Sequence, residues 1–371
     1  MMGRIEPIVM PKWGLAMTEG TVVGWEAGEG DRVDQGQDIL EIETTKITNV
    51  FEAPAGGTLR RQVVHEGDTV PVGALLGVLA DDEVSDEEID SFVSGFVVEA
   101  DDGEAAGEGA PEPRKAEAGG RTLRYLEMGA GEGTPVLLVH GFGADLNAWM
   151  FVQPTLAEGR RTVALDLPGH GGSQKDVGAG TPESMADTLS AFMDEVGLER
   201  AHVVAHSLGG AVALALASAK PDRVSGLTLI APAGLGDEIN HEFITGFIEA
   251  GRRKEMKPVL GLLVADPSLV SRDMIEDVLK AKRIDGAEEA LRTVAAANFA
   301  GGRQAVLLRD ALAGLSCPVE IAWGEADRIL PASHAEGLPE AVRVRRMADV
   351  GHMPHMEAAG EVTRLILAGL E

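Results

Sequence analysis

The sequence is poor in cysteine and in long hydrophobic runs. Cys317 is the single cysteine, so no disulfide can form within the chain, and a reducing cytoplasm is the compartment we expect. The strand-like run that begins at Cys317 favours core packing over a nucleophilic role for this thiol. The sequence has no run of about 18 uncharged apolar residues, which excludes a membrane-spanning helix. The opening residues MMGRIEPIVMPKWG lack the apolar core of a secretion signal, so export is not expected.

Basic residues are also scarce. The chain has 32 Lys and Arg against 60 Asp and Glu, which gives a formal net charge of −28. The long-range field of such a surface repels polyanions and anionic lipids, so neither nucleic acid nor a membrane is an expected partner. An anionic substrate would need a local basic patch.

The acidic charge is concentrated between two regions of ordinary composition. Residues 81–118 contain 14 acidic and two basic residues, and residues 104–120 are almost entirely Ala, Gly, Glu and Pro. Such a segment cannot bury a core and repels itself, so residues 81–120 are predicted to form an acidic flexible linker. Within it, Ser85 and Glu88 have capping-box spacing at the start of an amphipathic stretch, residues 85–98. That stretch is either a docking element or a transiently ordered patch of linker.

Before the linker, residues 4–80 contain an internal repeat with an offset of 37 residues. The motif E-G-D-x-V-x-x-G begins at Glu29 and again at Glu66, and a strand-like apolar run follows each copy. Two similar β-units within about 75 residues predict a small all-β sandwich with quasi-twofold symmetry. Lys46 falls between the copies, so we expect it near the tip of a tight hairpin. Most exposed lysines only aid solubility; the symmetric placement is what makes Lys46 a functional candidate.

The segments around Lys46 resemble the lipoyl domains of 2-oxo acid and acetoin dehydrogenase complexes. The matching stretches are VMPKWGLAMTEGTVVGWEAGEGDRV, ETTKIT and EAPAGGTL. The resemblance implies that Lys46 carries lipoic acid in amide linkage, as a long arm whose reduced thiols can hold an acyl thioester. Thr45 and Ile47 flank the lysine here, whereas Asp and Ala are commonest in the family. Biotin carriers flank their lysine with methionines, so the lipoyl group is favoured over biotin.

After the linker, residues 121–371 alternate short apolar strands with helix-like stretches. Runs such as VLLVH at 136, RTVALDL at 161 and AHVVAHS at 201 predict the buried strands of a mostly parallel α/β sheet. The strand pattern disappears between about residues 232 and 315, where amphipathic helices are predicted to form an inserted cap.

Ser207 is the candidate nucleophile of this region. It lies in AHSLGG, after an apolar strand and before a predicted helix, where a sharp turn would project its hydroxyl from the carboxyl edge of the sheet. Ala205 replaces the first glycine of the common G-x-S-x-G pattern, which is a mild departure. Asp327 and His352 each follow a predicted strand, in the chain order serine, acid, histidine that is typical of α/β-hydrolases.

These residue types have complementary chemistry. His352 would accept the proton of Ser207, and Asp327 would orient the imidazole and stabilise its protonated form. The HGFG segment offers the backbone N–H of Phe142, and Leu208 behind the nucleophile offers a second N–H, as donors to an oxyanion.

Other residues compete for some of these roles. His355 is the alternative base, and Glu325 and Asp349 are weaker alternatives for the acid. His206, next to the nucleophile, is expected to point away from its hydroxyl and to be structural. Packing roles are also expected for two loop histidines, His140 and His170.

Residues 121–371 resemble α/β-hydrolases, and the whole arrangement resembles the dihydrolipoyl acetyltransferase subunits of bacterial acetoin dehydrogenase complexes. The resemblance implies acetyl transfer from S-acetyldihydrolipoyl-Lys46 to coenzyme A at Ser207, with no metal site. It implies an oligomer within a complex, with thiamine-diphosphate-dependent acetoin dehydrogenase subunits that load the arm and a lipoamide dehydrogenase that reoxidises it. The H-x-x-x-D-G signature of ordinary 2-oxo acid acyltransferases is absent from the sequence.

Coenzyme A carries several phosphates, so its use by this acidic chain requires a basic patch. Arg252, Arg253, Lys254 and Lys257 cluster in the predicted cap and are the candidate phosphate ligands, with a solvated helix face as the alternative. Two rival functions stay open, namely a thioesterase or ester hydrolase fed by the lipoyl arm and a non-catalytic scaffold. One triad serves transfer and hydrolysis alike, and transfer can proceed through an acyl-serine or by direct thiol attack.

Overall fold

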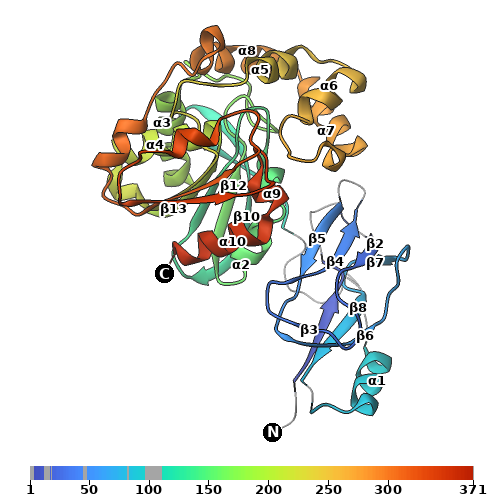
Figure 1. Cartoon of the computed structure of the whole chain (residues 1–371). Helices are drawn as coiled ribbons and strands as arrows, with labels where there is room; N and C mark the ends of the chain where they lie inside the picture. The colour runs from blue at the N-terminus through green and yellow to red at the C-terminus, as the bar shows by residue number, and fades with distance from the viewer. Residues whose placement is uncertain are drawn as a thin grey trace. The chain divides into compact units, whose positions relative to one another are not determined.

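A computed structural model describes residues 4–11, 17, 19–44, 48–81, 83–96 and 111–370. They belong to two compact units, Met1–Ala110 and Pro111–Glu371, and each unit is described by itself (Figure 1). Lys46 and its two neighbours lie outside the described residues. In the described ranges, no helix combines the length and the apolar composition needed to cross a membrane.

The N-terminal unit is a sandwich of two four-stranded antiparallel sheets, with strand orders β1-β8-β6-β3 and β5-β4-β2-β7. Its strands are β1 Ile5–Val9, β2 Glu19–Trp25, β3 Arg32–Val33, β4 Asp38–Glu43, β5 Thr48–Glu52, β6 Gly57–Gln62, β7 Thr69–Pro71 and β8 Leu75–Ala80. Aliphatic side chains from both sheets form the core, among them Ile8, Val22, Ile42, Leu59 and Leu76.

The 37-residue repeat organises this sandwich as predicted. The offset relates β2, β3 and β4 to β6, β7 and β8, which hold matching places in the two sheets. The two EGD turns also share a backbone: Gly30 has φ 94° and Gly67 has φ 86°, a region that favours glycine. In each turn the aspartate accepts a backbone N–H from three residues earlier, at 2.8 Å for Asp31 and 2.9 Å for Asp68.

The strands on either side of Lys46 form an antiparallel hairpin. β4 pairs with β5 from Asp38 opposite Glu52 to Glu43 opposite Thr48. Lys46 therefore belongs to the connection that joins the two strands beyond their last pair.

A helix, α1 (Asp86–Gly95), packs on this unit and explains the amphipathic stretch of the sequence. Ser85 and Glu88 form the predicted capping box at its start. Ile89 is fully buried against apolar side chains of β8. Arg60 and Arg61 of β6 pair with acidic residues of the helix. Residues 86–95 are thus an ordered helix docked on its own sandwich and not the flexible segment that their composition predicted.

The C-terminal unit is built on an eight-stranded sheet of order β16-β15-β14-β13-β11-β12-β10-β9. Its strands are β9 Arg114–Ala118, β10 Arg121–Glu132, β11 Val136–Val139, β12 Arg160–Leu165, β13 Ala201–His206, β14 Val224–Ile230, β15 Val319–Gly324 and β16 Val342–Met347. Strands β11 to β16 run parallel, whereas β10 is antiparallel to both β9 and β12.

Strand β9 corrects the other end of the predicted linker. Its composition is polar, but Ala116 and Ala118 are buried in alternation while the strand pairs with β10. This edge strand was not predicted from the sequence because its buried side chains are only the methyl groups of two alanines, among charged residues.

Helices cover both faces of the sheet (Figure 1). α3 (Pro182–Glu195) and α4 (Leu208–Ala219) contribute to one apolar core, and α2 (Gln153–Ala157) and α10 (Ala359–Ala368) contribute to another. The predicted helical insertion lies between β14 and β15 and contains α5 (His241–Glu249), α6 (Arg253–Leu260), α7 (Arg272–Lys282) and α8 (Ala287–Asn298). We call these four helices and their connections the cap.

Candidate active site

Ser207 lies on the sharp turn between β13 and α4. Its backbone has φ 51° and ψ −118°, a conformation that costs a residue with a side chain about 1–3 kcal/mol. The turn closes because glycines follow it: a Cβ on Gly209 would lie 2.5 Å from the carbonyl oxygen of His140, and one on Gly210 would lie 2.6 Å from Pro232. Ala205, the departure from the common pattern, is a fully buried residue of β13.

The structure brings Ser207, His352 and Asp327 together in one hydrogen-bonded chain. His352 Nε2 lies 3.0 Å from Ser207 Oγ, and its Nδ1 lies 2.8 Å from Asp327 Oδ2. Ser207 is 7% exposed and His352 is 2% exposed, so the chain is shielded from bulk water. Such an arrangement can take a proton from the serine hydroxyl and stabilise the resulting imidazolium.

The carboxylate of Asp327 is held in place by other groups. Its Oδ1 accepts the backbone N–H groups of Ile329 at 2.8 Å and Leu330 at 3.0 Å. Its Oδ2 accepts the indole N–H of Trp323 at 3.1 Å in addition to the His352 ring. The two alternative acids of the sequence, Glu325 and Asp349, are exposed.

His355, the alternative base, lies in a different environment. It is fully buried, with its ring between those of Trp149 and His206 at centroid distances of 4.9 and 4.5 Å. Burial lowers the pKa of His355 to about 3. In the part of the chain that the structure describes, neither nitrogen of His355 has a hydrogen-bond partner, so this residue is no substitute for His352.

His206 supports the backbone of the triad histidine. Its Nε2–H donates to the carbonyl of His352 at 2.8 Å, and the two rings lie 4.7 Å apart. Burial, and then the neighbouring imidazoles, hold the pKa of His206 well below its usual range. A neutral imidazole has one N–H donor, and in His206 this donor is used in the hydrogen bond to the carbonyl of His352.

The segment HGFG lies directly against the nucleophile. A Cβ on Gly141 would be 3.0 Å from Ser207 Cβ and 2.9 Å from His206 Nδ1, so only glycine allows this approach. The next peptide N–H belongs to Phe142, whose ring is buried against Phe247 of α5 and against Phe299. Leu208 is the first residue of α4, where a backbone N–H has no partner within the helix.

The cap is bonded to the loop that carries His352, a feature that the sequence did not reveal. The backbone N–H of His352 donates to the carbonyl of Leu263, just after α6, at 2.8 Å. The carboxylate of Glu357 accepts N–H groups from Ala265 at 2.7 Å, from Gly351 at 3.0 Å and from Met353 at 3.3 Å. Burial raises the pKa of Glu357, and the three backbone N–H donors act in the opposite direction by stabilising the carboxylate. Only folding places this glutamate between the cap and both neighbours of His352.

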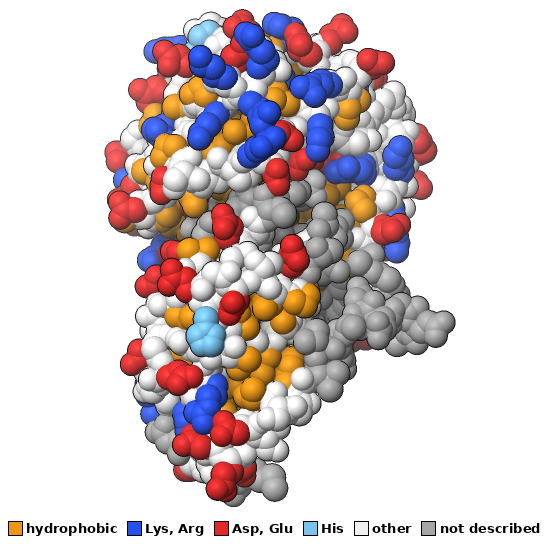
Figure 2. All heavy atoms as spheres, turned by 90° about the vertical axis from the view of Figure 1, so that its right-hand side faces the viewer, with side chains coloured by type: hydrophobic (Ala, Val, Ile, Leu, Met, Phe, Trp, Pro, Cys, Tyr) orange, Lys and Arg blue, Asp and Glu red, His pale blue; other side chains and the backbone are white. Residues whose placement is uncertain are grey.

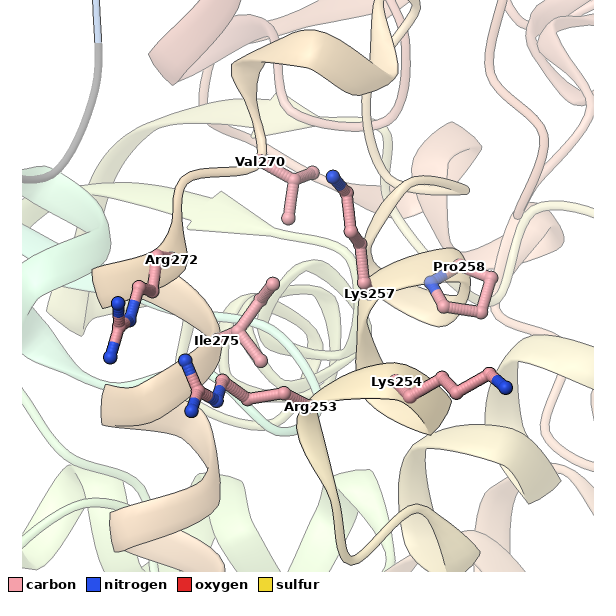
Figure 3. A pocket seen from close by; sticks show the side chains of 7 residues that line it. All are labelled: Arg253, Lys254, Lys257, Pro258, Val270, Arg272 and Ile275. Carbon is pink, nitrogen blue, oxygen red and sulfur yellow. The ribbon is translucent and has the colours of Figure 1, made fainter.

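The basic residues predicted in the cap divide into two groups. Arg253, Lys254 and Lys257 line one pocket between α6 and α7 (Figure 3). Arg252 does not line it; this side chain is 83% exposed and pairs with Glu255. In the described residues, no group of three or more His, Cys, Asp or Glu is placed to hold a metal ion.

Comparisons with known proteins agree with both halves of this structure. The family described as alpha/beta hydrolase fold matches residues 134–359, and the family described as biotin-requiring enzyme matches residues 6–79. The chain is 47% identical to the dihydrolipoyllysine-residue acetyltransferase component of the acetoin cleaving system of Pseudomonas putida, over 100% of this chain and 99% of that protein. The corresponding protein of Cupriavidus necator is 48% identical over 98% of this chain and 96% of its own length.

A solved structure supports the fold of the C-terminal unit. The meta-cleavage product hydrolase of Pseudomonas fluorescens IP01 superposes with a TM-score of 0.63 over 69% of this chain and 96% of that chain. At 24% sequence identity, this likeness concerns the fold alone.

Proposed function

The chain belongs to the family of dihydrolipoyllysine-residue acetyltransferase components of acetoin cleaving systems, and on that premise we propose that it transfers an acetyl group from a lipoyl-linked thioester to the thiol of coenzyme A at Ser207. The observation that carries the proposal is the hydrogen-bonded chain of Ser207, His352 and Asp327 on the same polypeptide as a lipoyl-type sandwich.

The N-terminal unit fits a covalently attached lipoyl group at Lys46. The β4–β5 hairpin brackets this lysine, and the 37-residue symmetry places the hairpin between two equivalent halves. When bound there, the group supplies a thiol that carries acyl groups as thioesters on a long arm. The other partners that we propose are a thiamine-diphosphate-dependent dehydrogenase and a lipoamide dehydrogenase, within the multienzyme system to which the relatives belong.

The first half of the reaction would transfer the acetyl group to the serine. Ser207 Oγ attacks the thioester carbonyl while His352 Nε2 takes its proton across the 3.0 Å contact. The backbone N–H groups of Phe142 and Leu208 stabilise the oxyanion, each worth on the order of 3 kcal/mol. The carbon–sulfur bond then breaks, and His352 returns the proton to the departing thiol, which leaves an acetyl ester on Ser207.

The second half reverses these roles with a new thiol. His352 takes the proton of the coenzyme A thiol, whose sulfur attacks the acetyl ester. The bond between carbon and Ser207 Oγ breaks, and the proton passes from His352 to the serine. A thioester is consumed and a thioester is formed, so the main requirement is the exclusion of water. The near-complete burial of Ser207 and His352 limits the access of bulk water to these groups.

The acceptor experiment distinguishes this function from its two rivals. Full-length protein receives S-acetyl-dihydrolipoamide with and without coenzyme A, and both acetyl-coenzyme A and acetate are measured. We expect acetyl-coenzyme A as the main product. Acetate at one rate under both conditions would make the protein a thioesterase, and no turnover would make it a scaffold.

A variant of the nucleophile tests the acetyl-serine step. We expect Ser207→Ala to reduce the rate of acetyl transfer by at least about 10³-fold, because no oxygen remains to receive the acetyl group. Full transfer by this variant would replace the covalent route with direct attack by the coenzyme A thiol.

A further inference from the structure

A basic pocket lies between α6 and α7 of the cap, outside the Ser207 triad. It has a volume of about 420 Å³, and Figure 3 shows its lining side chains. Buried Val270 and Ile275 form an apolar floor together with Pro258. The basic side chains around this floor come from both helices and are exposed: Arg253, Lys254, Lys257 and Arg272.

The pocket is an electropositive exception on an acidic protein. Four cationic side chains line it on a chain of net charge −28, and Figure 2 shows Lys and Arg side chains gathered on this side of the molecule. Glu276 lies 3.3 Å from Arg253 and 3.2 Å from Arg272, so one carboxylate holds both guanidinium groups on the same side of the pocket. Across the part of the chain that the structure describes, Lys254 and Lys257 form no ion pair.

We propose that this pocket binds the phosphorylated adenosine end of coenzyme A, an inference that rests on the proposed function. Guanidinium and ammonium groups are the side chains that bind phosphate best. Each guanidinium has five N–H donors, so Arg253 and Arg272 can bind a phosphate monoester with the donors that do not face Glu276. The apolar floor offers a surface to the flat adenine ring, as nucleotide sites commonly do. The sequence pointed to α6 alone; the structure adds Arg272 from α7 and leaves out Arg252.

The position of the pocket suits a molecule whose thiol lies far from its phosphates. Lys257 on the pocket precedes Leu263 by six residues, so the chain between them spans no more than about 20 Å. Leu263 accepts the backbone N–H of His352, and the ring of His352 contacts Ser207. The pantetheine arm of coenzyme A is the part of the molecule that would have to span the distance from the pocket to the nucleophile.

The test measures KM of the full-length chain for three acceptors with free S-acetyl-dihydrolipoamide as donor. The acceptors are coenzyme A, 3′-dephospho-coenzyme A and pantetheine, which lacks the nucleotide. The variants are Lys257→Gln and Arg272→Gln. The control is Lys280→Gln, which removes a cation of α7 that pairs with Asp277 and does not line the pocket.

We expect each pocket variant to raise KM for coenzyme A about tenfold or more, the usual effect of losing a hydrogen bond to a charged group. KM for pantetheine should stay constant, and the control should match the wild type with every acceptor. An unchanged KM for coenzyme A in both pocket variants would overturn the proposal. An equal rise in the Lys280 control, or an equal rise for pantetheine, would also overturn it.

Two further results separate this proposal from others. If wild-type protein forms no acetyl-coenzyme A, the proposed function fails, and calorimetric titration of coenzyme A into wild type and Lys257→Gln then tests the pocket alone; equal affinities would overturn it. If the pocket variants slow only transfer from the chain's own lipoylated Lys46, with KM for coenzyme A unchanged, the patch receives the acidic N-terminal unit and the nucleotide assignment is wrong.

Discussion

The backbone N–H of His352 donates to the carbonyl of Leu263 at 2.8 Å, so the cap and the proposed catalytic base are joined by a hydrogen bond. Glu357 reinforces this link by accepting N–H groups from Ala265 of the cap and from both neighbours of His352. A change in the cap would thus reach the backbone around His352 through these four hydrogen bonds.

The first prediction concerns Glu357. Glu357→Gln removes an acceptor and sets an amide N–H₂ against backbone N–H donors, which costs about 1–3 kcal/mol. We expect kcat to fall about tenfold or more while KM for pantetheine changes little. The control is Glu361→Gln, which removes an equal charge from an exposed pair with Arg345. Equal kcat values in the two variants would assign Glu357 a purely structural role.

The second prediction concerns the acid of the triad. Asp327→Asn keeps an oxygen for Ile329 and Leu330 but turns an N–H₂ group toward the indole N–H of Trp323 and the ring of His352. The imidazole then adopts the wrong tautomer, and we expect kcat to fall about 10³–10⁴-fold with the fold intact. Steady-state kinetics and circular dichroism check both points. Glu325→Gln should retain full activity, and a similar loss in both variants would contradict this assignment of the acid.

The third prediction concerns the strained turn at Ser207. Its φ of 51° is accessible to glycine at low cost. Ser207→Gly should therefore unfold with a free energy about 1–2 kcal/mol higher than Ser207→Ala, although both lack the nucleophile. Urea denaturation of the two variants measures the difference. A glycine variant less stable than the alanine variant would show that the turn is not strained.

The fourth prediction concerns acid stability. Burial lowers the pKa of His170 and His355 to about 3 and that of His202 to about 4. The unfolded chain, with histidine pKa values near about 6.5, then binds more protons than the folded one. The free energy of unfolding that comes from burying these histidines in neutral form is fully present above pH about 6.5. Below that pH it falls by about 1.4 kcal/mol per pH unit for each histidine. The decrease ends near pH 3 to 4, where the folded protein also takes up the protons.

Replacing one of these histidines tests the cause. His355→Leu forfeits no hydrogen bond to the described residues, so stability at pH 7 should change by less than about 1.5 kcal/mol. The free energy of unfolding of the C-terminal unit should then fall less steeply with decreasing pH, by the contribution of one histidine. Urea denaturation between pH 4 and about 7 measures this dependence. An unchanged slope would mean that His355 is not neutral in the folded protein.

The fifth prediction concerns helix α1. Ile89→Ala should destabilise the N-terminal unit by about 2–5 kcal/mol, because Ile89 is fully buried against β8. The exposed neighbour Glu87 offers a control as Glu87→Ala. Native-state hydrogen exchange should show faster exchange in the N-terminal unit and no change in the α/β unit. If protection of the sandwich is unchanged, α1 contributes nothing to its stability.

The sequence was informative wherever a function depends on local order along the chain. Ser207 needs a strand before it and a helix after it, and Asp327 and His352 each need to follow a strand, so all three leave a pattern. The repeat is equally local, because each EGD turn requires a glycine with positive φ.

Other features depend on contacts between distant segments and leave no such pattern. Glu357 resembles any helical glutamate until folding brings Ala265 beside it. Arg272 joins the basic pocket only through the packing of α6 against α7. The sequence left the docking of helix α1 open and gave no sign of strand β9, because a few buried groups decide whether a short polar element docks.

The pairing of β1 with β8 determines how the lysine hairpin can be presented. Ile5 lies opposite Ala80, so the chain enters and leaves the N-terminal unit through the sheet that α1 also covers. The strands that flank Lys46 in the sequence, β4 and β5, belong to the other sheet. The two ends of the unit and the strands that flank Lys46 thus lie in different sheets, so a contact made with one sheet need not disturb the other. Under the proposed function, a partner enzyme would contact the sheet of β4 and β5 while the other sheet keeps the unit joined to the rest of the chain.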